Sequence, residues 1–133
     1  MTPPSLSHIG IIVPDLEAAI GLFASHFNLA PGPILVNEAQ GVRLVQFDLG
    51  NARVELLTPL HSEGPIATFL ARNPKGGLHH LALATDDLGA ALHDLEQQGV
   101  SPIAAQSVNV LGRPFAFLRP GDHFGVLVEL EGS

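Results

Sequence analysis

The chain has 133 residues, 46% of them hydrophobic, and a formal net charge of −7 with only six Lys and Arg residues. This composition is typical of one compact globular domain, and the shortage of basic side chains argues against nucleic acid as the main partner. Cysteine is absent, so disulfides and thiolate metal sites are excluded. Since no apolar run approaches the length of a membrane helix and no signal-peptide pattern opens the chain, we expect a cytoplasmic protein without a membrane partner.

The first half of the chain is predicted to form a strand, a helix and three further strands. An apolar, β-branched run from His8 to Val13 ends at Pro14 and indicates the first strand. Asp15 is a suitable N-cap for a helix with one buried face, on which apolar residues recur at helical spacing: Leu16, Ala19, Ile20, Phe23 and Phe27. Strands are then predicted at 34–36, 42–49 and 53–57, and a short helix at 66–72.

The second half is predicted to repeat this order. A strand is expected from Leu78 to Thr85, then a helix capped by Asp86 or Asp87 and ended by Gly99 in a left-handed conformation. Further strands are predicted at 103–105, 114–118 and 125–130. We therefore expect one α+β domain over residues 1–133, made of two βαβββ modules at about 5–60 and 77–131. Modules of this size are marginal alone, so they should share a core or an interface.

The two modules carry the same residue pattern at an offset of 72 positions. Each copy opens its first strand with a histidine, His8 or His80, and later places one acid inside an apolar strand, Glu55 or Glu129. In an alternating strand either acid could point into water, and a lone histidine is more often structural. The twofold recurrence of the whole set instead favours one metal site formed by His8, Glu55, His80 and Glu129, because a buried carboxylate is costly unless it is paired or coordinated.

This set of donors suits one divalent ion per chain. Two neutral imidazoles and two carboxylates are typical ligands of Mn²⁺, Co²⁺, Ni²⁺, Zn²⁺ or Fe²⁺. An octahedral ion would keep two positions for water or substrate oxygens, which is an open, catalytic arrangement.

The other five histidines are expected to be less important. His79 precedes His80 on the same strand, so it should face the opposite side. His26 and His93 are expected on the polar sides of helices, whereas His61 and His123 fall in loops, where His123 could border the cleft.

Segments along nearly the whole chain, from His8 to Glu131, resemble the methylmalonyl-CoA epimerases. That family belongs to the vicinal oxygen chelate superfamily, as does glyoxalase I. The repeat and the ligand set are typical of the superfamily, whereas three features point to the epimerase branch: Pro65-Ile66-Ala67-Thr68-Phe69-Leu70, the paired histidines of Gly77-Leu78-His79-His80-Leu81-Ala82, and the ending Gly125-Val126-Leu127-Val128-Glu129-Leu130.

The resemblance implies a fold, a partner and a reaction. The implied fold is the glyoxalase fold, in which paired βαβββ modules form a curved mixed sheet around a metal site, commonly in a homodimer. The implied enzyme is an isomerase that epimerises a 2-methyl-branched acyl-CoA, methylmalonyl-CoA, through an enolate stabilised by the metal as a Lewis acid. Glu129 matches the metal-bound carboxylate that also serves as the catalytic acid–base.

Two departures from the family pattern concern the second acid–base and the CoA site. Some members carry a second glutamate where this chain has Leu44, and neither Leu44 nor the nearby Gln46 can act as a carboxylate base. The usual lysine after the strand at 114–118 is Gly121 here, so Arg113 or Arg119 would have to compensate.

Other functions of the same fold stay open at this level. A glyoxalase I-like lyase or isomerase can use the same four ligands, but no convincing cationic or polar pocket for glutathione is evident. A non-enzymatic small-molecule binder would often lack the ligands. A ring-cleaving dioxygenase would typically use two histidines and one carboxylate for iron, so a fourth ligand argues against it.

Overall fold

The structure is a computed structural model that describes residues 2–133. No helix within that range is long and apolar enough to cross a membrane. The elements follow in the order β1 (Ser5–Ile12), α1 (Leu16–Phe27), β2 (Leu35–Asn37), β3 (Val42–Asp48), β4 (Arg53–Pro59), α2 (Pro65–Arg72), β5 (Gly77–Ala84), α3 (Leu88–Gln97), β6 (Ser107–Val108), β7 (Pro114–Leu118), a 3₁₀ helix η1 (Pro120–His123) and β8 (Val128–Glu131).

Most of the predicted elements are confirmed, but two strands in the second half were predicted wrongly. Residues 103–105 do not form a strand, and β6 lies instead at Ser107–Val108, where it pairs with β7 before a tight turn. β8 begins at Val128 and not at Gly125. Phe124 and Gly125 have φ of 57° and 83°, a left-handed conformation that cannot continue an extended strand.

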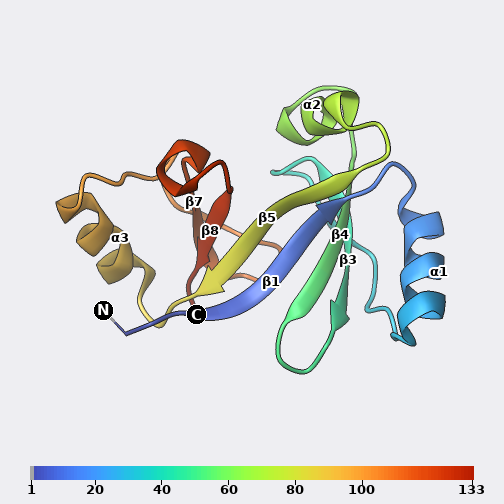
Figure 1. Cartoon of the computed structure of the whole chain (residues 1–133), viewed down its shortest axis with the longest axis horizontal. Coiled ribbons are helices and arrows are strands. Elements are labelled where there is room, and N and C mark those ends of the chain that lie inside the picture. The colour runs from blue at the N-terminus through green and yellow to red at the C-terminus, as the bar shows by residue number, and fades with distance from the viewer. Residues whose placement is uncertain (1) are drawn as a thin grey trace. The chain divides into compact units, whose positions relative to one another are not determined.

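Residues 9–79 form one compact unit. Its strands lie in the order β2-β3-β4-β1, and β3 is antiparallel to both β2 and β4. Helix α1 packs against β3 and β4, as Figure 1 shows in blue and green. Asp15 caps this helix by accepting a hydrogen bond from the Ala18 N–H, as expected. Leu16 joins Val45, Phe47 and Leu56 in the core of the unit.

The apolar face of α1 is shorter than its sequence spacing predicts. Ala19, Ile20 and Phe23 pack against the core of this unit. Phe27, the last residue of the helix, is 61% exposed. The helix ends directly after it because Asn28 adopts a left-handed conformation.

Residues 2–8 and 80–133 form the other compact unit. Its strands lie in the order β1-β5-β8-β7-β6; β5 and β8 are parallel, and β8 and β7 are antiparallel. Asp87 caps α3 through the Ala90 N–H, and Gly99 has φ of 82°, as the sequence predicts. Leu88 and Ala91 of α3 belong to a buried cluster with Leu118, Val128 and Leu130. The α+β fold with a mixed sheet is therefore confirmed.

Candidate metal centre

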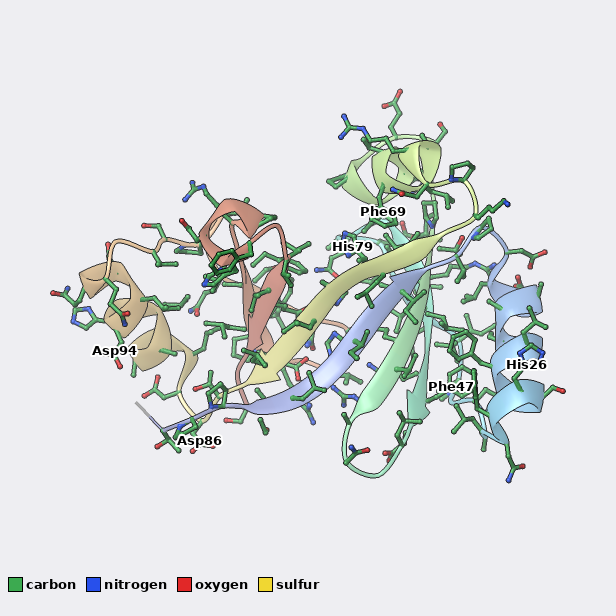
Figure 2. The ribbon with its side chains drawn as sticks, viewed as in Figure 1. His26, Phe47, Phe69, His79, Asp86 and Asp94 are labelled. Carbon is green, nitrogen blue, oxygen red and sulfur yellow. The ribbon has the colours of Figure 1, made fainter. Side chains whose placement is uncertain are left out.

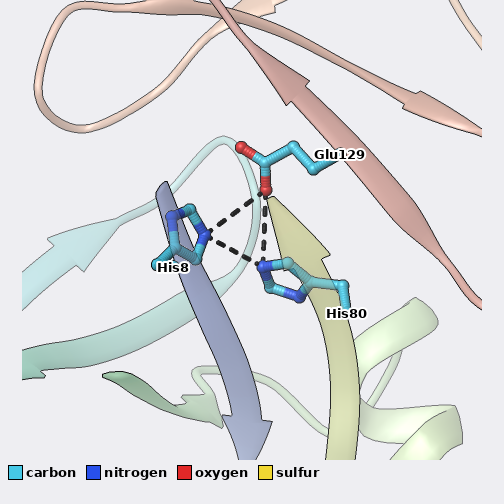
Figure 3. Close-up of side chains that lie close together, drawn as sticks. All are labelled: His8, His80 and Glu129. Atoms are coloured by element: carbon cyan, nitrogen blue, oxygen red, sulfur yellow. Dashed lines mark hydrogen bonds and ion pairs between the residues drawn. The ribbon is translucent and has the colours of Figure 1, made fainter. Parts of the chain in front are cut away.

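Three buried side chains from three strands converge within one compact unit. His8 comes from β1, His80 from β5 and Glu129 from β8, and they are 3%, 5% and 6% exposed. The two Nε2 atoms are 3.1 Å apart. Glu129 Oε1 lies 3.6 Å from His8 Nε2 and 3.4 Å from His80 Nε2, as the dashed lines in Figure 3 indicate. The duplicated histidine and the second acid therefore meet, as the repeat predicts.

The spacing of these donor atoms fits a metal ion. One donor atom from each of the three residues lies within 4.8 Å of the others. With bond lengths of about 2.1 Å, neighbouring donor atoms are about 3.0 Å apart around an octahedral ion and about 3.4 Å apart around a tetrahedral one. The separations of 3.1 and 3.4 Å fall in this range, and the third, 3.6 Å between His8 Nε2 and Glu129 Oε1, lies just above it. Imidazole and carboxylate are also the donors that first-row divalent metals accept.

An aromatic ring borders Glu129 and His80. Phe117 in β7 is the direct cross-strand partner of Glu129 in β8. Its ring meets that of His80 edge to face, with centroids 5.6 Å apart. On β7 the neighbour of Glu129 is thus a hydrocarbon ring that offers no N–H or O–H donor, and on β5 its partner is Ala82.

Glu55 has a different neighbour. It is a buried residue of β4, 8% exposed, in the unit formed by residues 9–79. Its cross-strand partner is Gln46 in β3, whose amide Nε2 donates a 2.9 Å hydrogen bond to Glu55 Oε2. The amide holds one carboxylate oxygen and so orients the group. Membership of Glu55 in the ligand set stays a prediction from the repeat.

Leu44, where a second acid occurs in some epimerases, is a core residue here. It is buried in β3 with Ile12, Val42 and Leu57. An acid at this position would need a partner or a metal to offset its desolvation. Leu44 is therefore a packing residue of the unit formed by residues 9–79.

His79 lies beside Phe69, as Figure 2 shows, and not within the cluster of donors. The two rings meet edge to face with centroids 5.3 Å apart. Burial lowers the pKa of His79, because the charged imidazolium loses hydration there. His79 is therefore a packing residue of the unit formed by residues 9–79, as alternation along the strand predicts.

The other histidines lie outside the cluster of donors. His26, His61 and His93 are exposed, and His61 faces Glu38 at 3.8 Å. His123 is half-buried at the end of η1. A role for His123 at the border of the cleft stays a prediction.

Two further residues, Ser7 and Glu131, lie on the side of the cluster next to His8. The sequence did not predict either of them. Ser7 Oγ lies 3.1 Å from His8 Nδ1 and donates a 2.8 Å hydrogen bond to Glu131 Oε1. Arg113 Nη1 lies 3.4 Å from the same carboxylate, so this arginine contacts Glu131. Arg119 is exposed, with Nη1 3.4 Å from the Ser101 carbonyl. The only sequence signal for Glu131 is a second acid directly after an apolar strand.

Comparisons with known proteins agree with this geometry. The model of the Glyoxalase/Bleomycin resistance protein/Dioxygenase superfamily matches residues 7–117. Mitochondrial methylmalonyl-CoA epimerase of Bos taurus is 38% identical over 127 residues, which cover 95% of this chain and 73% of the relative. An ethylmalonyl-CoA/methylmalonyl-CoA epimerase of Cereibacter sphaeroides is also 38% identical, over 95% of this chain and 96% of the relative.

A solved structure extends the likeness to three dimensions. A methylmalonyl-CoA epimerase in complex with methylmalonyl-CoA and NH₄⁺ superposes with a TM-score of 0.91 at 31% identity, covering 99% of this chain and 96% of the other. The family model, the relatives and the fold all agree with the motifs found along the sequence. The chain belongs to the Glyoxalase/Bleomycin resistance protein/Dioxygenase superfamily and, within it, to the family of the methylmalonyl-CoA epimerases.

Proposed function

We propose that the protein is a metal-dependent epimerase of methylmalonyl-CoA. The observation that carries the proposal is the convergence of His8, His80 and Glu129 in a chain of this family. Two imidazoles and one carboxylate form half of an octahedral shell and leave room for further ligands. The relative from Cereibacter sphaeroides bears ethylmalonyl-CoA in its name as well, so a 2-ethyl acyl group is the second substrate to test.

The metal ligands in this proposal are His8, His80, Glu129 and Glu55. The first three have the required spacing, and Glu55 is included because it occupies in the first module the position that Glu129 occupies in the second. A divalent ion held there would supply Lewis-acid stabilisation of the negative charge that develops on the thioester oxygen. Cobalt, manganese, nickel, zinc and iron all suit these donors.

Glu129 is the residue that we assign to proton transfer. Epimerisation requires removal of the proton at Cα of the acyl group and its return to the other face. What supports this role is that Glu129 matches the family's metal-bound carboxylate that also serves as acid–base, and that it lies beside the imidazole nitrogens of His8 and His80. Glu55 already accepts a hydrogen bond from Gln46, which suits a residue that only holds the ion.

Isotope exchange tests the proposed function directly. The protein loaded with Co²⁺ should exchange the α-hydrogen of methylmalonyl-CoA with deuterium from D₂O and interconvert the two epimers. Ethylmalonyl-CoA and the hemithioacetal of glutathione are assayed in parallel. Turnover of the hemithioacetal without exchange at Cα of either acyl-CoA would assign a glyoxalase I-like reaction and contradict the proposal.

A homodimer is the oligomeric state that we propose, on the family resemblance alone. Sedimentation equilibrium of the intact chain would test it, with a mass of twice 14.0 kDa expected. A monomeric mass over the concentrations used in the activity assay would contradict this part of the proposal.

A further inference from the structure

Glu131 is the most deeply buried acid among the described residues, and the proposed reaction does not use it. It ends β8 and is 1% exposed. A carboxylate removed from water costs several kcal/mol unless donors replace its hydration. Such donors are present: Ser7 Oγ and Asn109 Nδ2 each lie 2.8 Å from a Glu131 oxygen, and Arg113 Nη1 lies at 3.4 Å.

The donor nearest to the metal centre is Ser7, and its hydroxyl has only one proton to give. Glu131 with three donors around it is an acceptor, so the Ser7 O–H proton points to Glu131 Oε1. Ser7 Oγ also lies 3.1 Å from His8 Nδ1. A hydrogen bond at this second contact requires its proton from the imidazole, because the hydroxyl proton is already donated. His8 Nδ1 therefore carries a proton.

This proton placement determines which nitrogen of His8 is available to the ion. A neutral imidazole carries one N–H, so a proton on Nδ1 leaves a lone pair on Nε2. His8 Nε2 is the atom that faces His80 Nε2 and Glu129 Oε1. We propose that Ser7 and Glu131 are positioning residues that hold His8 in the Nδ1–H tautomer and so prepare Nε2 for the metal.

A turn fixes Glu131 from its other side. The Asn109 side-chain oxygen accepts hydrogen bonds from the backbone N–H groups of Leu111 and Arg113, both at 3.0 Å. Its NH₂ group is thereby directed at Glu131 Oε2. Gly112 adopts φ of 79° inside this turn, a conformation that favours glycine. The chain of contacts thus runs from the turn through Glu131 and Ser7 to His8.

The part of this inference that concerns metal affinity rests on the proposed function, whereas the tautomer does not. Groups that hydrogen-bond the far nitrogen of a ligand histidine typically change metal affinity by about 10- to 100-fold. Ser7→Ala removes the hydroxyl, and Ser7→Thr retains one. Ser5→Ala is the matched control, because Ser5 is an exposed serine two positions earlier on the same strand.

Two readouts decide the proposal. In the metal-free parent protein, two-bond ¹⁵N–¹H correlation spectra should show the His8 proton on Nδ1. Titration with Co²⁺ in competition with a chelator should show about 10- to 100-fold weaker binding for Ser7→Ala, with Ser7→Thr and Ser5→Ala close to the parent.

Either of two results would overturn the proposal. One is a proton on Nε2 of His8 in the parent protein, a measurement that needs no variant to fold. The other is a folded Ser7→Ala protein that binds Co²⁺ as tightly as the parent. If the parent itself binds no Co²⁺, the proposed function fails while the spectra still decide the tautomer.

Discussion

The two acids of the repeat occupy matching positions in sequence and different surroundings in space. Glu129 faces two imidazole nitrogens at 3.4 and 3.6 Å, and its partner across the sheet is the ring of Phe117. Glu55 has Gln46 across the sheet and accepts a 2.9 Å hydrogen bond from its amide. The two acids thus share their position in the sequence repeat, while the residue beside each of them on a neighbouring strand differs, Gln46 on β3 and Phe117 on β7.

This difference supports a division of labour between the two acids. The amide of Gln46 holds one oxygen of Glu55 and so orients this carboxylate as a ligand. Phe117, the residue beside Glu129 on β7, offers no amide donor of this kind. On this account Glu55 only binds the ion, and Glu129 binds it and transfers the proton.

Removal of His8 or His80 should have the largest effect on metal binding, because each supplies one of the donor atoms that meet Glu129. His8→Ala and His80→Ala each delete one of three convergent donors. We expect the Co²⁺ affinity measured by calorimetry to fall by at least about 100-fold, more than outer contacts typically contribute. His93→Ala, an exposed change on α3, is the control. If His8→Ala and His80→Ala bind Co²⁺ as tightly as the parent, the ion binds at another site.

A substitution at Phe117 would give Glu129 the kind of neighbour that Glu55 has. Phe117→Gln introduces an amide opposite Glu129, whereas Phe117→Leu removes the ring without adding a donor. We expect α-proton exchange to be about 10-fold slower in the glutamine variant than in the leucine variant, because a hydrogen bond from the new amide would stabilise the charged carboxylate. Equal rates in the two metal-loaded variants would remove the basis for the division of labour.

Loss of the amide at Gln46 should weaken the metal site through Glu55. Gln46→Leu deletes the 2.9 Å hydrogen bond that orients the carboxylate. We expect about 10-fold weaker Co²⁺ binding, at the lower end of the range for contacts that orient a ligand. Gln97→Leu on the exposed end of α3 controls for the change in polarity. Binding as tight as that of the parent would exclude Glu55 from the ligand set.

The smallest effect concerns His79, the histidine whose ring meets that of Phe69 edge to face. Burial lowers its pKa below 6.5, so below about pH 6.5 the unfolded chain binds more protons than the folded one. The free energy of unfolding should therefore fall as the pH decreases from about 6.5 towards the lowered pKa. Urea unfolding should show a shallower decline for His79→Leu than for the parent. In His93→Leu the free energy of unfolding should fall with pH as it does in the parent. An equal slope in His79→Leu and His93→Leu would contradict the assignment of this pH dependence to His79.

Local patterns and the repeat predicted much of the fold and the core of the site. Strand β7 has the predicted bounds, and helix α1 begins directly after its predicted N-cap, Asp15. His8 and His80, which occupy matching positions in the repeat, lie together in the structure, and Glu129 joins them from β8. The sequence predicted neither the displaced β6 nor the late start of β8, since these depend on turns around Gly112 and Phe124.

The buried contacts around His8 could not be predicted, because they are long-range. Ser7 and Glu131 are 124 positions apart in the chain, and nothing in either local pattern indicates a partner. Likewise, Gln46 is recognised as the partner of Glu55 only once the register of β3 and β4 is known. Sequence periodicity places a side chain on a face, whereas its hydrogen bonds depend on the alignment of strands.

The most direct test of the account compares Glu129→Gln with Glu55→Gln, both fully loaded with Co²⁺, in deuterium exchange at Cα of methylmalonyl-CoA. A glutamine can still coordinate through its carbonyl oxygen, but it cannot accept the proton. We predict that the exchange rate falls by about 100-fold or more for Glu129→Gln, as expected for loss of a positioned base, and by less than about 10-fold for Glu55→Gln. Near-parental exchange in the Glu129→Gln protein would contradict the account and make His123 the next residue to test.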